Sequence, residues 1–420
     1  MKSISLASPR HLAGTIKPGI LDGLARRGVL RRLQALQVGH LVLRDGDVAH
    51  CFGQDAPGVE PSACIEVLDP RFYSEIAFGG SIGAGEAWML GYWRCDELVD
   101  LVRLLLRNRA VLDGMETGLA RLTQPLQKLF HRVNRNTHEG ARRNIAAHYD
   151  LGNDFFALWL DETMMYSCAI FSQPGMSLHQ AQLARLDHIC RKLQLSADDH
   201  LVEIGTGWGG LAIHAARHYG CRVTTTTISR EQYDLAHRRI SAAGLHDRIT
   251  LLLEDFRDLD GQYDKLVSVE MIEAIGSDLY QDFFRQCSSL LKPDGLMLIQ
   301  AITIADQRYA QAQRSVDFIQ RYIFPGSCLP SSAAMTHTVA THTDMRLLDL
   351  EDIGLHYATT LSCWRDNFLA RLDDVRSMGY PEQFIRMWIF YLGYCEGAFL
   401  ERAISDLQII FSKPEFREPT

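Results

Sequence analysis

Between residues 200 and 304, short apolar runs alternate with longer amphipathic stretches, and this alternation predicts a mostly parallel sheet. Four of the runs cover residues 201–204, 223–227, 249–253 and 265–269. Runs of this length are typical of buried strands, and the periodic stretches between them are typical of helices. Strands and helices that alternate in this way form layered α/β structures. We therefore expect an α/β, Rossmann-like domain in this part of the chain.

A helix is expected to begin directly after Ser177, ahead of the first of these strands. Ser177 and Gln180 have the spacing of a capping box, in which each side chain bonds the other residue's backbone N–H. The apolar residues that follow recur at helical spacing, and they are Leu183, Leu186, Ile189, Cys190 and Leu193. We place the start of this larger domain at residue 146 and its end at residue 413.

The first 110 residues are expected to form a smaller α+β domain. Residues 41–48 contain Asp45 and Gly46 between apolar positions, which is typical of a hairpin turn. Residues 78–86 carry four glycines and predict a turn that opens a helix. No long apolar strand precedes these glycines, so a structural turn is favoured over a second nucleotide-binding loop.

A basic segment lies between the two expected domains. Residues 103–143 carry nine Arg or Lys and three Asp or Glu, in a chain whose net charge is −8. Two interpretations stay open for the linker at residues 111–145. It is either a solvated helix or a surface attracted to anionic lipid headgroups, worth about 1 kcal/mol per basic residue near a membrane.

Composition narrows the class of protein. The 420 residues favour two domains, and the acidic net charge argues against general nucleic-acid binding. Ten cysteines without a Cys-x-x-Cys pair indicate neither a metal site nor a disulfide framework, so we expect reduced thiols in the cytoplasm. No signal peptide is evident. The most apolar late stretch, residues 387–400, contains Glu396 and is too short to cross a bilayer, so we expect peripheral membrane contact.

A glycine-rich loop follows the first apolar run. Gly205, Gly207 and Gly209 let the backbone turn sharply and let a nucleotide approach the main chain. The helix start behind them offers free N–H groups. Dinucleotides, S-adenosylmethionine and phosphates all use such loops, and the alternative is a turn that binds no ligand.

The next strands favour S-adenosylmethionine. A nicotinamide site usually has an acid about 20 residues after the loop, but residues 223–227 end in threonines and the next acid is Glu231. Hydroxyl and amide groups at Thr227 and Gln232 can still bind a ribose. Phe256, at the end of the third run, suits an adenine ring. This order of features predicts an S-adenosylmethionine-dependent methyltransferase.

Further motifs make the chain resemble the cyclopropane-fatty-acid synthases, including the mycolic acid cyclopropane synthases. The matching segments are residues 148–156, 165–171, 201–210, 272–273, 322–326, 329–330, 356–361, 391–395 and 411–413. The resemblance implies methyl transfer from S-adenosylmethionine to a cis double bond of an unsaturated membrane phospholipid, which forms a cyclopropane fatty acid. It also implies a cytoplasmic enzyme, peripheral at the inner membrane surface, with a possible homodimer and an N-terminal accessory domain that helps lipid access.

The implied reaction depends on alignment, because an alkene is a weak nucleophile. Holding the sulfonium methyl and the double bond in line in a dry cavity supplies most of the catalysis. Methyl attack leaves a carbocation, and loss of a proton from the new methyl closes the ring. The resemblance implies that a bound bicarbonate takes this proton.

The resemblance also assigns residues by position. The cofactor site would comprise Tyr166, Ser167, Glu203, Gly205, Gly207, Gly209, Thr227, Gln232, Phe256 and Arg257. The bicarbonate site would comprise Cys168, Glu273, Gln300, the backbone of Ile302, and Tyr357, whose ring would also face the cation. Cys395 matches a further family cysteine and is kept as a catalytic candidate, although a structural role is favoured.

The chain departs from the better-known synthases at the implied bicarbonate site. Gln300 stands where they have a histidine, and Ala274 stands where they have a histidine after the glutamate. Glutamine can hydrogen-bond an anion but carries no charge. The product therefore stays open among cyclopropane, methylene-branched and methyl-branched chains. Methylation of a small amine and a non-enzymatic lipid-binding role are the remaining alternatives, and Glu273 together with Tyr357 favours the lipid reaction.

Overall fold

The computed structural model describes residues 20–54, 56, 58–117 and 151–418. The chain divides into two compact units. The N-terminal unit contains residues 1–130, 315–319 and 369–403, and the catalytic unit contains residues 131–314, 320–368 and 404–420. Residues 315–319 and 369–403 therefore group with the first unit, although the sequence places them inside the second expected domain.

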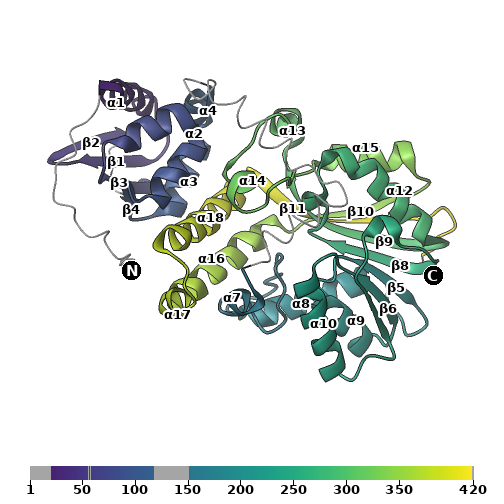
Figure 1. Ribbon diagram of the computed structural model, residues 1–420. Coiled ribbons are helices and arrows are strands. Elements are labelled where there is room, and N and C mark those ends of the chain that lie inside the picture. Colours follow the sequence, from purple (N-terminus) through teal and green to yellow (C-terminus); the bar gives the residue numbers. More distant parts are fainter. Residues whose placement is uncertain (1–19, 55, 57, 118–150, 419–420) are drawn as a thin grey trace. The chain divides into compact units, whose positions relative to one another are not determined.

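The catalytic unit is built on a seven-stranded sheet with the order β10-β11-β9-β8-β5-β6-β7 (Figure 1). The pairs from β9 to β7 are parallel, and β11 pairs antiparallel with both β9 and β10. This confirms the predicted Rossmann-like α/β fold. The strands are β5 (His200–Ile204), β6 (Arg222–Thr226), β7 (Ile249–Leu252), β8 (Tyr263–Val269), β9 (Leu291–Ile304), β10 (Arg346–Asp352) and β11 (Ile404–Ser412).

Helices and two apolar clusters complete this unit. Val202 and Ile204 of β5 lie in one cluster with residues of α12, while Leu201 lies in the other with residues of α8 and α9. Alternate strand residues thus enter opposite layers, as the pleat requires. The helices are α7 (Asn153–Ala157), α8 (Leu178–Lys192), α9 (Gly210–His218), α10 (Arg230–Ala242), α11 (Ile272–Ile275), α12 (Tyr280–Leu290), α13 (Asp306–Ala312), α15 (Ser332–His342) and α16 (Gly354–Ala370).

Helix α8 begins as the sequence predicts. Ser177 accepts a hydrogen bond from the Gln180 N–H, and the Gln180 side chain accepts one from the Ser177 N–H. The expected apolar residues are buried, except Leu183, which is 37% exposed. Leu183 lies away from the buried face of α8, which includes Gln182 and Arg185.

The N-terminal unit contains a four-stranded sheet with the order β2-β1-β3-β4. Its strands are β1 (His40–Asp45), β2 (Val48–Gly53), β3 (Ser62–Val67) and β4 (Trp93–Cys95). Strands β1 and β2 form the predicted hairpin, with Asp45 opposite Val48. The helices are α1 (Ile20–Leu33), α2 (Arg71–Met89), α3 (Leu98–Arg107), α4 (Arg109–Thr117), α17 (Leu372–Ser377) and α18 (Glu382–Leu400), and α14 (Phe318–Tyr322) begins in this unit.

The four glycines at residues 79–85 lie inside α2 and do not open a helix. The helix already begins at Arg71, and only Gly80 leaves the helical conformation, with φ of 58°. At Gly85 a Cβ atom would come within 2.5 Å of the Phe318 ring. The glycines therefore serve a kink and close packing.

Two expectations about membranes have different outcomes. Residues 387–400 lie in α18, whose side chains are mostly buried, and within the described part of the chain no helix has the length and apolar character to span a bilayer. Most of the expected linker at residues 111–145 lies outside the described residues, so both interpretations of it stay open.

Candidate active site

The glycine-rich loop joins β5 to α9 at the carboxyl end of the sheet, where α/β folds bind nucleotides. Gly205 has φ of 98° and Gly209 has φ of 84°, values that favour glycine. The N–H groups of Gly205 and Thr206 both donate to the Thr226 carbonyl, which fixes the loop against β6. The glycines at these positions are therefore required by the backbone.

Two neighbouring segments pack on this loop. A Cβ atom at Gly205 would lie 3.3 Å from Cγ of Met271, the residue after Glu270. A Cβ atom at Gly210 would lie 2.5 Å from Sδ of Met165. The loop is therefore in contact with the segments that precede Tyr166 and follow β8.

The expected ribose residues lie together at the end of β6. Thr227 Oγ1 donates to Gln232 Oε1 at 2.7 Å, and both side chains are buried. Ser229 caps α10 by accepting a hydrogen bond from the Gln232 N–H. These bonds hold Thr227 and Gln232 in place, and their contact with a cofactor stays a prediction.

Glu203 points from β5 toward β6 and is buried. Its Oε2 accepts a hydrogen bond of 2.6 Å from Thr225 Oγ1. Burial raises the pKa of Glu203 to about 7, against the opposing effects of Thr225 and Arg185. Its visible partner is therefore a strand residue, and a role in cofactor binding stays a prediction.

Phe256 and Arg257 follow β7 in a short helical turn, Phe256–Asp258. Phe256 packs edge-on against Phe283, with ring centroids 5.4 Å apart, and belongs to one of the two apolar clusters. Asp255 binds the Arg257 guanidinium, with an Oδ2–Nη2 distance of 2.6 Å. The structure therefore gives Phe256 a packing role, and the predicted adenine contact would add to it.

Tyr166 and Ser167 are set by aromatic packing and by α8. The Tyr166 ring lies 5.3 Å from both Trp159 and Trp364, measured between centroids. Gln182 Nε2 donates to the Ser167 carbonyl at 2.9 Å. The Ser167 hydroxyl is buried without a hydrogen-bond partner among the described residues, so it is available to a ligand.

Three of the predicted catalytic residues meet at Glu270, directly after β8. Glu270 Oε1 accepts hydrogen bonds from the Cys168 N–H at 2.8 Å and from Gln300 Nε2 at 2.7 Å. Glu270 Oε2 accepts a hydrogen bond from the Tyr357 hydroxyl at 2.6 Å. The sequence placed Glu270 at a strand end without giving it a role, and the structure makes it the centre of the site.

A second carboxyl group adjoins this centre from β11. Gln300 Nε2 also donates to Asp406 Oδ2 at 2.9 Å, and Gln408 Nε2 donates to Gln300 Oε1 at 3.1 Å. Burial raises the pKa of Asp406 well above its ordinary value, and the charges of Glu270 and Glu273 raise it further. Both effects favour the protonated form of Asp406.

Arg185 supplies the opposite charge from α8. Its side chain has no exposed surface, and its one hydrogen bond to a described residue runs from Nη2 to Gln182 Oε1 at 3.0 Å. Burial lowers the pKa of Arg185, but the charges of Glu270, Cys168 and Asp406 oppose this effect, and a guanidinium stays charged in proteins. A positive charge beside the acids favours an ionised Glu270.

Glu273 lies on α11 and bonds Ile302 directly. Its Oε1 accepts the Ile302 N–H, while its buried Oε2 has no hydrogen-bond partner among the described residues. Burial raises the pKa of Glu273 to about 8, and the Glu270 charge adds to this. Glu273 and the Ile302 N–H, which were both expected to bind the bicarbonate ion, are therefore hydrogen-bonded to each other.

A comparison of the sequence with known protein families identifies the family of this chain. A profile described as mycolic acid cyclopropane synthetase matches residues 136–409. The chain belongs to this family. It is an S-adenosylmethionine-dependent methyltransferase of the cyclopropane synthase type, and its family relatives modify lipids.

Individual relatives of this cyclopropane synthetase family member support the same family assignment. The tuberculostearic acid methyltransferase UfaA1 of Mycobacterium tuberculosis is 40% identical over 328 residues, which are 76% of this chain and 76% of that protein. The cyclopropane-fatty-acyl-phospholipid synthase of Escherichia coli K12 is 38% identical over 354 residues, covering 84% of this chain and 88% of that protein. The solved structure of mycolic acid cyclopropane synthase CmaA1 complexed with SAH and CTAB has a TM-score of 0.61 at 29% identity, and the match covers 65% of this chain and 98% of that chain.

Glu270, Asp406 and the residues that hydrogen-bond to them form a group that we call the acid cluster, with the charge of Arg185 beside it. The sequence analysis assigned no role to Glu270, Asp406 or Arg185. Asp406 could have been found as a carboxylate inside the apolar strand at residues 404–412, and Arg185 as a charge on the apolar face of a helix. The candidate Cys395 lies on α18, which groups with the N-terminal unit, and burial raises the pKa of its thiol.

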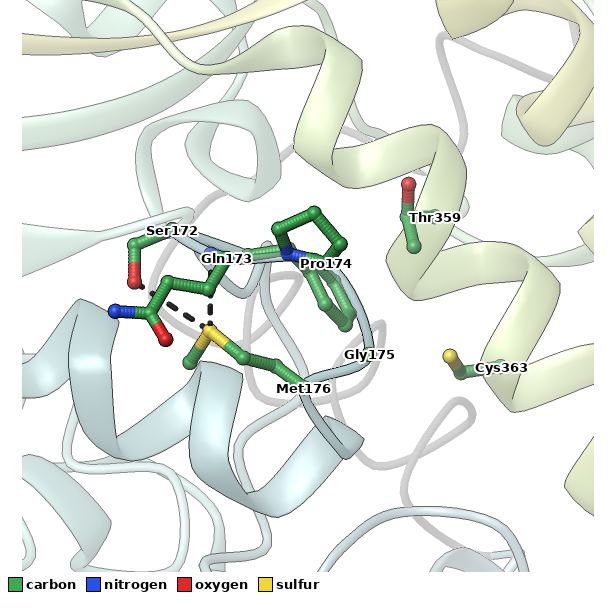
Figure 2. A pocket seen from close by; sticks show the side chains of 8 residues that line it. Ser172, Gln173, Pro174, Gly175, Met176, Thr359 and Cys363 are labelled. Atoms are coloured by element: carbon green, nitrogen blue, oxygen red, sulfur yellow. Dashed lines mark hydrogen bonds between the residues drawn. The ribbon is translucent and has the colours of Figure 1, made fainter.

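A shallow hollow lies beside the segment that follows Cys168. Figure 2 shows the loop of residues 172–176 on one side of it, with Thr359 and Cys363 of α16 on the other. Met176 Sδ accepts hydrogen bonds from Ser172 Oγ and the Gln173 N–H and so closes the loop on itself. None of the predicted site residues lines this hollow, so it is separate from the acid cluster.

Proposed function

We propose that this protein transfers the methyl group of S-adenosylmethionine to a cis double bond in an unsaturated phospholipid acyl chain, with a cyclopropane fatty acid as the product. The observation that carries the proposal is the convergence of Cys168, Gln300 and Tyr357 on Glu270, next to the glycine loop. A carboxylate beside an aromatic ring suits a positively charged intermediate.

The site suits a reaction that needs orientation and exclusion of water. Gln300 and Asp406 have no exposed surface, and Tyr357 and Ser167 are nearly as buried. A carbocation formed there meets fixed dipoles and a carboxylate, with little water to trap it as an alcohol. Loss of a proton is then the productive route, which supports ring closure.

The bicarbonate implied by the resemblance fits this arrangement poorly. The Cys168 N–H, Gln300 Nε2 and the Tyr357 hydroxyl donate to Glu270, and the Ile302 N–H donates to Glu273. The four donors expected for an added anion are thus bonded to two carboxyl groups of the chain. We therefore derive no step through bicarbonate.

A second product class is supported by the relative from M. tuberculosis, whose name describes a tuberculostearic acid methyltransferase. On this alternative a hydride first moves from the methylated carbon to the neighbouring cationic carbon, and the new cation then loses a proton from its methyl group, which gives a methylene branch. Whether the methyl proton is lost before or after this hydride shift decides between the two outcomes.

Use of a membrane phospholipid requires contact with the bilayer. We propose that the protein works in the cytoplasm, peripheral at the inner membrane surface, where the basic segment at residues 103–143 would meet anionic headgroups. A homodimer is part of this proposal. Co-sedimentation with anionic and neutral vesicles tests the first point, and analytical ultracentrifugation tests the second.

The experiment combines purified protein, S-adenosylmethionine and vesicles of a cis-unsaturated phospholipid. Mass analysis of the acyl chains is expected to show the gain of one methylene unit, and proton NMR is expected to show cyclopropane signals. Vinylidene signals would instead identify the methylene-branched product. Unchanged acyl chains, with transfer to a small amine in a parallel assay, would refute the lipid reaction.

A further inference from the structure

The geometry points to Glu270 as the base of the reaction, a carboxylate of the chain itself that stands where an added anion is expected. The inference rests on the proposed function, because it assigns the proton acceptor of that reaction. On this inference the base is Glu270, which is part of the chain, and no bicarbonate ion has to bind before each reaction. Three separate observations support it.

The first observation is the set of donors. An ionised carboxylate and bicarbonate share a planar O–C–O group with one negative charge, so they can use the same donors. Glu270 receives the backbone N–H of Cys168, the amide of Gln300 and the hydroxyl of Tyr357 at 2.6 to 2.8 Å. A neutral carboxylic acid would spend one oxygen on its own proton, so three converging donors indicate an anion.

The second observation is the backbone of Glu270. Its φ is 49°, in the left-handed region, which is unfavourable for a glutamate. The Glu270 N–H donates to the Gln300 carbonyl at 2.8 Å, which holds this conformation. Strained residues of this kind cluster at sites where the direction of a side chain matters. Here the strain aims a carboxylate at the cluster.

The third observation is the distribution of charge and access. Asp406 and Gln300 have no exposed surface, whereas Glu270 is only partly buried. Burial raises the pKa of Glu270, but the hydrogen bonds from Tyr357 and Cys168 and the charge of Arg185 oppose this. Burial and the acidic neighbours raise the pKa of Asp406, and it accepts one hydrogen bond from a described residue, from Gln300, where Glu270 accepts three, so the geometry favours the charge on Glu270.

The resulting step balances without another reactant. The π electrons of the alkene form a bond to the methyl carbon, and the carbon–sulfur bond breaks with its electron pair on sulfur. The other alkene carbon becomes a cation. Glu270 takes a proton from the new methyl, and the electrons of that C–H bond form the third bond of the ring. Glu270 returns its proton to water after the product leaves.

The test uses wild-type protein and E270G, assayed in carbon dioxide-free buffer with and without added bicarbonate or formate. Glycine accepts the left-handed backbone and leaves room for an ion. The wild-type rate is expected to be the same in both buffers. E270G is expected to lose about 100-fold or more, the usual contribution of a general base, and to regain activity in a saturable way with either anion.

Thermal melts provide a measurement that does not depend on turnover. Added bicarbonate or formate should raise the melting temperature of E270G and leave that of the wild type unchanged. E270Q fills the space without supplying a base, so it should be inactive and unresponsive to anions. E415Q, at an exposed glutamate of the same unit, is the matched control and should behave as wild type.

The outcomes separate this inference from the proposed function. A wild type that modifies no lipid refutes the proposed function before any variant is made. A wild type that is active only with bicarbonate overturns the role of Glu270. An E270G protein that binds S-adenosylmethionine normally by calorimetry, yet is either fully active or not restored by either anion, overturns it as well.

Discussion

Replacing Tyr357 by phenylalanine should shift the pH dependence of the enzyme toward alkaline pH. The Tyr357 hydroxyl donates to Glu270 Oε2 at 2.6 Å, and a bond of this kind stabilises the charged form of the carboxyl group. Removing the hydroxyl leaves the aromatic ring and its contact with Trp364, whose centroid is 5.9 Å away, in place. The change therefore isolates a single hydrogen bond.

The size of the shift follows from the strength of that bond. A hydrogen bond to a charged group contributes about 1.5 to 3 kcal/mol, and one pKa unit corresponds to about 1.4 kcal/mol. Losing this free energy should therefore raise the pKa of Glu270 in Y357F. Because a hydrogen bond to the ionised form lowers a pKa, its loss raises the pKa, and the active ionised base forms only at higher pH.

The assay is the pH profile of kcat/KM on vesicles of unsaturated phospholipid, in which the acid limb reports the base of the free enzyme. Y219F is the matched control. The Tyr219 hydroxyl, at the end of α9, donates to Asp187 Oδ1 of α8 over the same distance of 2.6 Å, and neither residue belongs to the predicted site. Its acid limb should coincide with that of the wild type. A Y357F profile that falls in height without moving along the pH axis would refute the reasoning.

Three further predictions concern the fold and the cofactor loop. S177A removes the side-chain cap of α8 and should lower the free energy of unfolding by about 1 kcal/mol in urea titrations, with kcat unchanged. G205A forces alanine to φ of 98° and sets its Cβ 3.3 Å from Met271, so calorimetry should show affinity for S-adenosylmethionine weakened by about 1 to 2 kcal/mol. The pKa of Glu203 is 4.5 in its ordinary state and about 7 in the fold. The folded protein therefore binds this proton more tightly, and stability should fall as pH rises from 4.5 toward 7, by at most about 1.4 kcal/mol per pH unit; E203Q should reduce that fall in urea titrations at the two pH values.

Each of these has a contrary result. Equal stability of S177A and wild type would mean that packing alone sets the start of α8. Unchanged cofactor affinity in G205A would mean that the loop relaxes at no cost. An E203Q protein with the same pH dependence as the wild type would mean that Glu203 titrates normally in the fold.

Local patterns in the sequence were enough for the framework of the catalytic unit. The four apolar runs became β5, β6, β7 and β8 within a residue or two, and the capping box at Ser177 formed as expected. These features depend on neighbours a few positions apart, which the sequence displays directly. The glycine loop belongs to the same class, because its backbone angles are a local requirement.

The acid cluster could not be predicted in the same way. Glu270 meets Cys168 and Tyr357 across 102 and 87 positions of sequence. Only the order of strands in the sheet brings these residues together, and that order is decided by packing of the whole unit. Resemblance to a family located three of the donors but not their acceptor, because the acceptor stands outside the motifs used for the assignment.

The position of β11 between β9 and β10 has a consequence for folding during synthesis. The chain leaves the catalytic unit at residue 369, builds α17 and α18 in the N-terminal unit, and returns at residue 404 to insert β11. Until that segment emerges from the ribosome, β9 presents an unpaired edge and β10 has no partner strand. Unpaired edges recruit other chains, so a nascent chain halted before Ile404 should aggregate or bind chaperones, and it would also lack Asp406 beside the catalytic carboxylate.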